Sequence, residues 1–96
     1  MTAYVIADID VHDEEAYREY VALVPATLQP YGGRFVVRAG HHETLEGDWR
    51  PHRLVVIEFP SASHARRWHE SEDYRAAQAI RHRTSAGSLV VVEGAG

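Results

Sequence analysis

Two carboxylates stand in segments that are otherwise almost entirely apolar. Asp8 and Glu58 both alternate onto the side of the predicted sheet that faces away from the helices. We expect them near the same ends of the two central strands, which we take to be parallel, with Arg38 or Arg34 from a neighbouring strand alongside. Two carboxylates and a guanidinium in a partly dry cavity could provide catalytic acid and base groups and a clamp for an anion. The alternative is an ion pair that only fixes the register of an interface or closes the end of a barrel.

A second candidate is the loop at residues 46–50 (EGDWR), which joins two predicted strands. An aromatic and charged loop of this kind can cover a pocket, so Trp49 is a candidate ligand-binding residue. The alternative is that the indole simply covers one end of a barrel or the rim of a dimer.

A third candidate lies on a predicted helix. Tyr74 and Arg81 are seven residues apart, which is two helical turns, so they share one face. With Trp68 nearby they could line a cleft between helix and sheet that holds an anionic ligand. The alternative is core packing together with a guanidinium that stabilises a helix C-terminus.

The composition removes several kinds of chemistry. The chain has no cysteine, which excludes thiol nucleophiles and thiolate metal sites, and no lysine, which excludes a Schiff-base mechanism. The seven histidines show no pair at the spacing that a metal site on one strand or helix face needs, so no metal is predicted. A lone catalytic histidine, such as His41 or His82, stays open.

Charge and hydropathy narrow the class of partner. The formal net charge of -4 disfavours nucleic acid and anionic membranes, because both need a basic surface. The predicted strand RLVVIEF carries a carboxylate where an RNA-binding sheet would carry stacking residues. No segment approaches the roughly 20 apolar residues of a membrane span, and the N-terminus lacks the pattern of a signal peptide. We therefore expect a cytoplasmic protein.

The elements that must position these residues follow from the apolar pattern. It predicts strands at residues 3–11, 34–40, 53–59 and 89–93, one helix after the first strand, and a helix after Pro60 that restarts at Ser71. The order β-α-β-β-α-β places both helical segments on one face of a four-stranded antiparallel sheet. The fold class is therefore α+β, of ferredoxin-like type, in a single domain over residues 1–96.

The second face of this sheet is also predicted to be apolar. If Val5, Ala7 and Ile9 face the helices, Tyr4 and Ile6 lie on the other side, and the last strand has no polar residue from 89 to 92. An exposed apolar sheet of this size risks aggregation in a monomer. Packing of this face against an identical subunit removes the risk, so a homodimer is predicted.

The chain also resembles a known family over nearly its whole length. The matching pieces are YVI at residues 4–6, YGG at 31–33, LEGDW at 45–49, IEFPS at 57–61, and then Trp68, Ser71, Tyr74 and Arg81. In their order and spacing they resemble the domain of unknown function 1330 family of the dimeric α/β-barrel superfamily. The resemblance implies a barrel of two facing sheets and a pocket between sheet and helices, but no settled activity. The wider superfamily includes cofactor-free oxygenases and lactone isomerases.

Two functional hypotheses follow. The first is an enzyme without metal or organic cofactor that acts on a small anionic or carbonyl-bearing molecule, with Glu58 and Asp8 as acid and base and Arg38 orienting the substrate. The second is a non-catalytic dimeric module that binds a small molecule or a protein. The charged groups on the sheet favour the first hypothesis, whereas the second needs only the apolar face.

Overall fold

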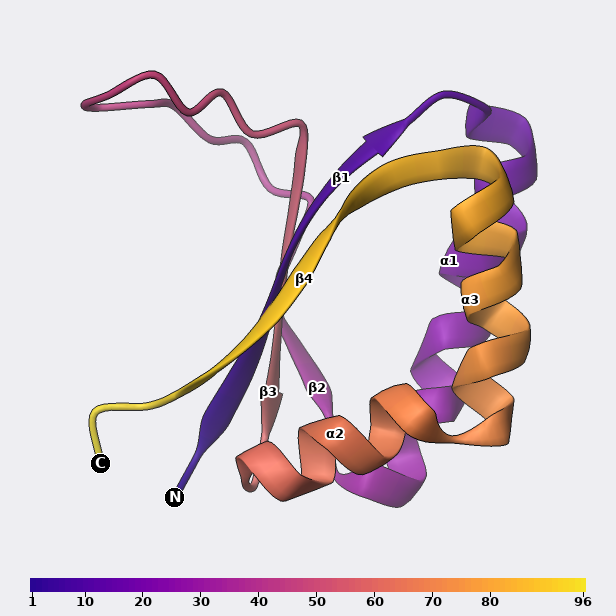
Figure 1. Cartoon of the computed structure of the whole chain (residues 1–96), viewed down its shortest axis with the longest axis vertical. Coiled ribbons are helices and arrows are strands. Elements are labelled where there is room, and N and C mark those ends of the chain that lie inside the picture. The colour runs from indigo at the N-terminus through magenta and orange to yellow at the C-terminus, as the bar shows by residue number, and fades with distance from the viewer.

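Four strands form one antiparallel sheet in the order β2-β3-β1-β4, in a computed structural model that describes residues 1–96 (Figure 1). The strands are β1 (Ala3–Val11), β2 (Arg34–Arg38), β3 (Arg53–Phe59) and β4 (Ser85–Glu93). The two longest, β1 and β4, pair along their whole length. The ferredoxin-like prediction is confirmed.

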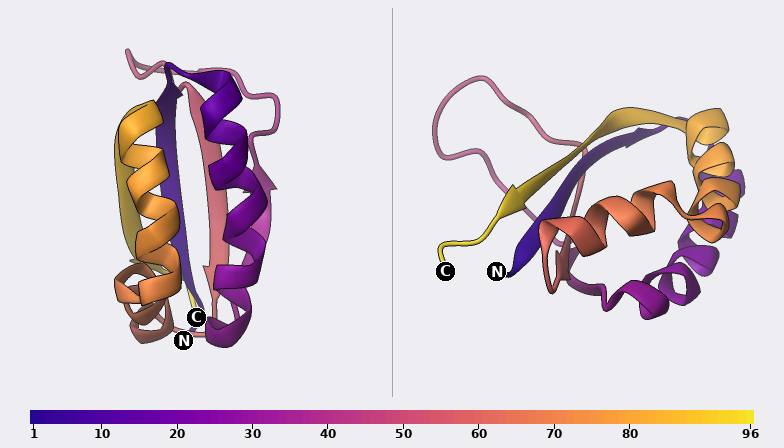
Figure 2. Two further views of the ribbon diagram at one scale, coloured as in Figure 1. Left: turned by 90° about the vertical axis from the view of Figure 1, so that its right-hand side faces the viewer. Right: turned by 60° about the horizontal axis from the view of Figure 1, so that its bottom comes forward.

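The helices all lie on one face of this sheet. They are α1 (Glu14–Leu28), the 3-10 turn η1 (Gln29–Tyr31), α2 (Ala62–Glu70) and α3 (Glu72–Thr84). Figure 2 shows α1 and α3 side by side along the strands, with α2 crossing near the end where both chain termini lie. The order is therefore β-α-β-β-α-α-β, with two helices where the sequence predicts a restart.

Short polar side chains begin the helices. Asp13 accepts a hydrogen bond from the Ala16 amide at the start of α1, and Ser71 accepts one from the Tyr74 amide at the start of α3. Ser71 therefore separates α2 from α3 and provides the N-cap of α3, as predicted. Gly32 ends η1 at φ 69°, a left-handed angle that glycine adopts without strain.

The direction of the central strands differs from the prediction. β1 and β3 are antiparallel, with Ala3 opposite Phe59 and Ile9 opposite Arg53. The connections explain this: the helical crossover makes β2 parallel to β1, and the direct connection from β2 to β3 then reverses the chain. The parallel pairing inferred from the sequence is wrong.

Two strands also begin or end at other residues than the apolar pattern predicts. β4 begins at Ser85 and not at residue 89, because Ser85 still pairs with Val11. β2 ends at Arg38 and contains an irregularity between Phe35 and Val37, where the pairing with β3 shifts by one residue. Such a bulge reverses the side on which the following side chains lie.

The core lies between the helices and the sheet. Trp68, Tyr74 and Phe59 are its largest fully buried side chains, and Val5 and Ile57 from the two central strands pack in the same cluster. The indole nitrogen of Trp68 donates to Thr27 Oγ1 at 3.0 Å, so this buried polar atom is satisfied. The alternation in β1 and β3 is as predicted, with Val5, Ala7, Ile9 and Ile57 on the helix side.

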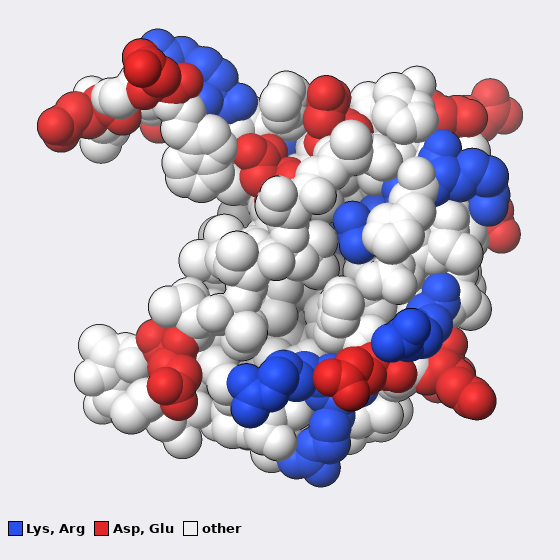
Figure 3. Space-filling model, in the orientation of Figure 1, with Lys and Arg blue, Asp and Glu red and all other residues white.

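The other face of the sheet, which we call the open face, carries no helix. Val90 and Val92 of β4 and Val36 of β2 are about half exposed. The space-filling view shows a hollow of mostly uncharged atoms there, bounded at one end by the protruding loop between β2 and β3 (Figures 1 and 3). No helix is long and apolar enough to cross a bilayer.

Candidate functional site

Asp8 and Glu58 both point to the open face, but they are not brought together. Glu58 lies opposite Tyr4 and Asp8 lies opposite Leu54, so four residues of strand separate them. At a rise of about 3.3 Å per residue this is about 13 Å along the strand. The expectation that the two carboxylates lie at the same strand ends is wrong, because it depended on parallel strands.

Glu58 pairs with Arg34 on the neighbouring strand β2. The guanidinium donates from Nε and Nη2 to the two carboxylate oxygens at 3.0 and 3.2 Å. The arginine side chain is 68% exposed and the glutamate 27%. A pair as open as this contributes little to stability, and its geometry suits the alternative of an ion pair on an interface surface.

Asp8 fixes the loop between β2 and β3, residues 39–52, which we call the arm. Its two carboxylate oxygens accept from the Trp49 indole nitrogen at 2.9 Å and the His52 amide at 2.8 Å. Burial by itself raises the pKa of Asp8, but these hydrogen bonds and the nearby His52 outweigh it and hold that pKa below its usual value. A carboxylate with a lowered pKa and both oxygens occupied is poorly suited to act as a general base.

Trp49 therefore has a partner on the sheet, although 60% of its surface is exposed. The arm extends beyond the body of the protein (Figure 1), and Leu45 within it is 89% exposed. Trp49 lines none of the described cavities, so its role as a ligand-binding residue stays a prediction.

Arg38 lies on the helix side of the sheet and not on the open face. It follows the bulge in β2, pairs with Val55, and donates from Nη2 to the carbonyl oxygen of Val21 on α1 at 3.0 Å. Its guanidinium also lies over the Phe35 ring, 4.2 Å from the centroid. Of the two alternatives Arg38 and Arg34, only Arg34 lies on the open face, where it pairs with Glu58.

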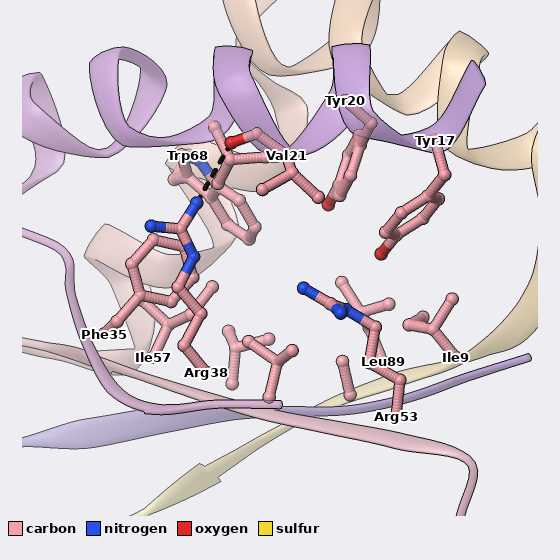
Figure 4. Close-up of a pocket in the computed structure, with 14 residues that line it drawn as sticks. Ile9, Tyr17, Tyr20, Val21, Phe35, Arg38, Arg53, Ile57, Trp68 and Leu89 are labelled. Carbon is pink, nitrogen blue, oxygen red and sulfur yellow. Dashed lines mark hydrogen bonds between the residues drawn. The ribbon is translucent and has the colours of Figure 1, made fainter. Parts of the chain in front are cut away.

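Arg38 instead stands at the mouth of a cavity between the helices and the sheet (Figure 4). This helix–sheet cavity has a volume of about 30 Å³, within a wider empty space of about 450 Å³ that includes its open mouth. Its floor is formed by β1, β2, β3 and β4, and its roof by α1 and Trp68 of α2. Its lining residues are Val5, Ala7, Ile9, Tyr17, Tyr20, Val21, Val24, Phe35, Arg38, Arg53, Val55, Ile57, Trp68 and Leu89.

Arg53 is the second cation of this cavity. Its guanidinium lies 5.4 Å from the centroid of the Tyr17 ring, and its Nε is buried without a hydrogen-bond partner. Arg38 is opposite Val55, so the two arginines are diagonal neighbours on adjacent strands, about 7–8 Å apart at the backbone. The lining contains no Asp or Glu, and neither arginine forms an ion pair.

Two tyrosine hydroxyls point into the same space. Figure 4 shows Tyr17 and Tyr20 reaching down from α1, with the Tyr17 hydroxyl directed toward Arg53. Burial raises the pKa of Tyr17 although Arg53 opposes it, and burial together with the neighbouring Tyr74 raises the pKa of Tyr20 far above its ordinary value. Both phenols therefore remain protonated at neutral pH and can donate hydrogen bonds.

Tyr74 and Arg81 share a helix face, as predicted, and bond to each other. Arg81 Nε donates to the Tyr74 hydroxyl at 3.3 Å, and that hydroxyl is 2.9 Å from the hydroxyl of Tyr20. Both side chains are buried, Tyr74 completely. They lie behind Tyr20 and do not line the helix–sheet cavity, which fits the core-packing alternative for their direct contacts.

Sequence reasoning missed Arg53, Tyr17 and Tyr20. A signal for Arg53 was present, because its alternation with Val55 and Ile57 places it on the helix side of an apolar strand. Tyr17 is on the apolar stripe of α1, where the ring is explained by packing and the hydroxyl carries no separate signal. No cluster of three or more His, Cys, Asp or Glu side chains could hold a metal ion.

Comparisons with known proteins agree with this architecture. The family model described as "Domain of unknown function (DUF1330)" matches residues 2–95. No curated protein matches the chain. Among solved structures, a protein of unknown function from Rhodopseudomonas palustris superposes with a TM-score of 0.78 at 16% identity, covering 99% of this chain and 83% of that one.

Two further structures have the same fold. SnoaB, described as a cofactor-independent oxygenase from Streptomyces nogalater, gives a TM-score of 0.69 at 13% identity over 99% of this chain and 94% of its own. HapK from Hahella chejuensis gives 0.65 at 16% identity over 98% and 93%. At these identities the likeness establishes the fold alone.

Proposed function

This chain belongs to the DUF1330 family, and because that description assigns no activity, we propose a function from the helix–sheet cavity. We propose that the protein binds a small molecule with an anionic or carbonyl oxygen on an apolar body, and acts on it without a metal or organic cofactor. One observation carries this proposal: Arg38 and Arg53 stand in an apolar cavity whose lining has no carboxylate. Unpaired guanidinium groups in such a place favour an anion.

The cavity also suggests how the ligand is oriented. Arg38 and Arg53 also line the outer groove beside α1, together with Arg18 and Glu14, so both stand where the cavity opens to solvent. The inner part is formed by apolar side chains such as Val5, Ile57 and Trp68. The charged oxygen would therefore lie near the mouth, and the apolar body would extend toward the core.

The chemistry available there is electrostatic. Tyr17 and Tyr20 hold their protons, and the lining contains no carboxylate or histidine that could take one. The substrate would therefore need a C–H bond acidic enough to lose its proton to water or buffer. The two guanidinium groups would then stabilise the resulting enolate oxygen. By analogy of fold, the cofactor-independent oxygenase SnoaB supports a reaction without a cofactor.

A non-catalytic ligand-binding module is the second candidate, and the absence of a general base from the cavity favours it. Asp8 and Glu58, proposed from the sequence as the acid/base groups, face the opposite side of the sheet. In this second case the same anion would bind in the same orientation and leave unchanged.

A second copy of this chain is proposed to cover the open face. The apolar side chains there are about half exposed, and the arm bounds a hollow beside them. Sheet-on-sheet packing would bury this surface and place Arg34 and Glu58 at the interface. A mass near 10.8 kDa by light scattering at micromolar concentration would contradict the dimer.

Phenylpyruvate, an acid with an enolisable ketone, tests the function. We expect wild type to bind it in an NMR titration and to accelerate exchange of its C3 protons with deuterated water. Arg53→Met should weaken binding about tenfold or more, the loss of one charged hydrogen bond. Arg38→Met should weaken it less, because Arg38 already donates to the Val21 carbonyl. Arg83→Met, at an exposed arginine near the end of α3, is the matched control.

The outcomes separate the two candidates. Binding that depends on the arginines, together with faster proton exchange, supports the enzyme. Binding without faster exchange supports the non-catalytic module. If both cavity variants bind phenylpyruvate as wild type does, the helix–sheet cavity is not the site.

A further inference from the structure

A chain of polar side chains runs from the helix–sheet cavity through the core to the surface. Tyr20 lines the cavity, its hydroxyl is 2.9 Å from that of Tyr74, and Tyr74 accepts from Arg81 Nε at 3.3 Å. Arg81 in turn lies 3.2 Å from His82 Nε2 through Nη2. Tyr74 is completely buried and Arg81 is 6% exposed, so water reaches little of this chain.

The directions of these hydrogen bonds follow from what each group can do. A guanidinium has donors only, so the Tyr74 oxygen must accept from Arg81. The Tyr74 hydroxyl has one other partner, the Tyr20 oxygen. If Tyr20 donated to Tyr74, the proton of Tyr74 would be buried without an acceptor, which native structures avoid. Tyr74 therefore donates to Tyr20.

The hydroxyl proton of Tyr20 can then be donated to a ligand in the cavity. No other hydrogen bond is made by the Tyr20 hydroxyl, and Figure 4 shows it directed into the space above the sheet. Of the other polar side chains in the lining, Arg38 and Arg53 are donors only, and the Tyr17 hydroxyl is directed toward the Arg53 guanidinium.

We infer that the buried chain from Arg81 through Tyr74 holds the Tyr20 hydroxyl as a hydrogen-bond donor, so that the cavity selects a ligand group that only accepts, such as a carboxylate or enolate, over an alcohol or amine. This inference rests on the proposed function and narrows its ligand class. Tyr74 and Arg81 are positioning residues, because they act through Tyr20. The chain does not conduct protons, since the guanidinium does not give one up.

The first test uses the unmodified protein. With isotope-labelled tyrosine, the hydroxyl proton of Tyr74 should exchange slowly with water and show a nuclear Overhauser effect to the ring protons of Tyr20. The hydroxyl proton of Tyr20 should exchange rapidly until a ligand binds. A slowly exchanging Tyr20 hydroxyl proton with an Overhauser effect to the Tyr74 ring would show that Tyr20 donates to Tyr74. That result would overturn the inference.

The second test measures ligand preference with two probes that share a phenyl group. Phenylacetate offers only acceptors, whereas 2-phenylethanol offers a donor and an acceptor. Wild type should bind phenylacetate at least about tenfold more tightly, a difference of 1.4 kcal/mol. Tyr74→Phe frees the Tyr20 hydroxyl to rotate and accept, so this preference should fall about threefold or more. Tyr31→Phe, at a tyrosine that does not line the cavity, should leave it unchanged.

The binding measurements distinguish failure of the proposed function from failure of this inference alone. If Arg38→Met and Arg53→Met leave phenylacetate binding unchanged, the proposed function fails and this inference fails with it. If those variants weaken binding but Tyr74→Phe keeps the wild-type preference, only this inference is overturned. Circular dichroism checks that each variant folds, and the NMR test on wild type decides the question if Tyr74→Phe does not fold.

Discussion

Trp49 donates from its indole nitrogen to the carboxylate of Asp8, 2.9 Å away, across 41 residues of sequence. The same carboxylate accepts from the His52 amide, so one side chain on β1 fixes the end of the arm. His52 also places its ring nitrogens 3.7 Å from Asp8 and from Asp10. Asp8 is therefore a structural anchor for the arm, a role distinct from the acid–base role proposed from the sequence.

Asp8→Ala should release the arm and leave the sheet intact. The substitution removes an acceptor of two hydrogen bonds to a charged group, and we expect a loss of about 1–3 kcal/mol of local stability. Hydrogen–deuterium exchange should rise in residues 41–52 and stay unchanged in β3. Glu93→Ala, at an exposed carboxylate on the neighbouring strand β4 that does not contact the arm, is the control. An unchanged exchange rate in the arm would contradict the anchoring role.

The hydrogen bonds that the arm donates to Asp8 should weaken at low pH. The pKa of Asp8 is lowered in the folded protein. The stability that the Asp8 carboxylate gives to the arm is therefore fully present above its pKa in the unfolded chain, about 3.9. It is lost as the pH falls through the lower folded pKa. Exchange in residues 41–52 should therefore increase below about pH 4 in wild type. In Asp8→Ala it should already be high at neutral pH, with little further change that depends on this group.

Thr27→Val should destabilise the core by about 1–3 kcal/mol, the cost of a buried polar group without a partner. The shape is nearly conserved, but the Trp68 indole nitrogen loses the acceptor that it has at 3.0 Å. Thr44→Val, in the exposed arm, is the control and should have little effect. Urea denaturation followed by the fluorescence of Trp68 measures both, with Trp49→Phe in the background to remove the second indole.

Gly87→Ala should separate β4 from β1. A Cβ at position 87 would lie 2.3 Å from the carbonyl oxygen of Asp8 and 2.9 Å from the Ile9 Cα, so backbone would have to move. We expect a loss of about 1–3 kcal/mol or failure to fold. Gly40→Ala meets no atom within 4 Å and should be neutral or slightly stabilising. Thermal unfolding compares the two, and equal melting temperatures would contradict the close approach.

Val92→Glu should convert the proposed dimer to a monomer. Val92 is 47% exposed on the open face, where a glutamate would place charge in the interface. Leu23→Glu is a matched control, because Leu23 is 42% exposed on the outer side of α1. Light scattering should give twice 10.8 kDa for wild type and Leu23→Glu, and 10.8 kDa for Val92→Glu. A loss of assembly in both variants, or in neither, would argue against the open face as the interface.

The local pattern predicts elements and faces better than it predicts which side chains meet. The alternation of Val5, Ala7 and Ile9 and the cap at Ser71 follow from short-range chemistry, and the structure confirms them. The position of Arg38 does not follow, because a one-residue bulge in β2 reverses its side and nothing in RFVVR marks it.

The candidate site could be predicted only in part for a related reason. The placement of Asp8 and Glu58 depended on the direction of two strands, which is a property of the connections and not of either segment. The contact between Asp8 and Trp49 depends on how a long loop folds back, which the sequence pattern does not encode. Arg53 could have been found, since its alternation within β3 already pointed to the helix side.

The hydrogen bond from Arg38 to the Val21 carbonyl spans the mouth of the cavity, from strand to helix. An anion that enters would exchange one acceptor of this guanidinium for another, so the net gain in hydrogen bonding at Arg38 would be small. Most of the favourable free energy would then come from the apolar body of the ligand as it leaves water. Binding should accordingly show a negative heat-capacity change in calorimetry, larger for ligands with longer apolar bodies, whereas the head group decides which ligands bind at all.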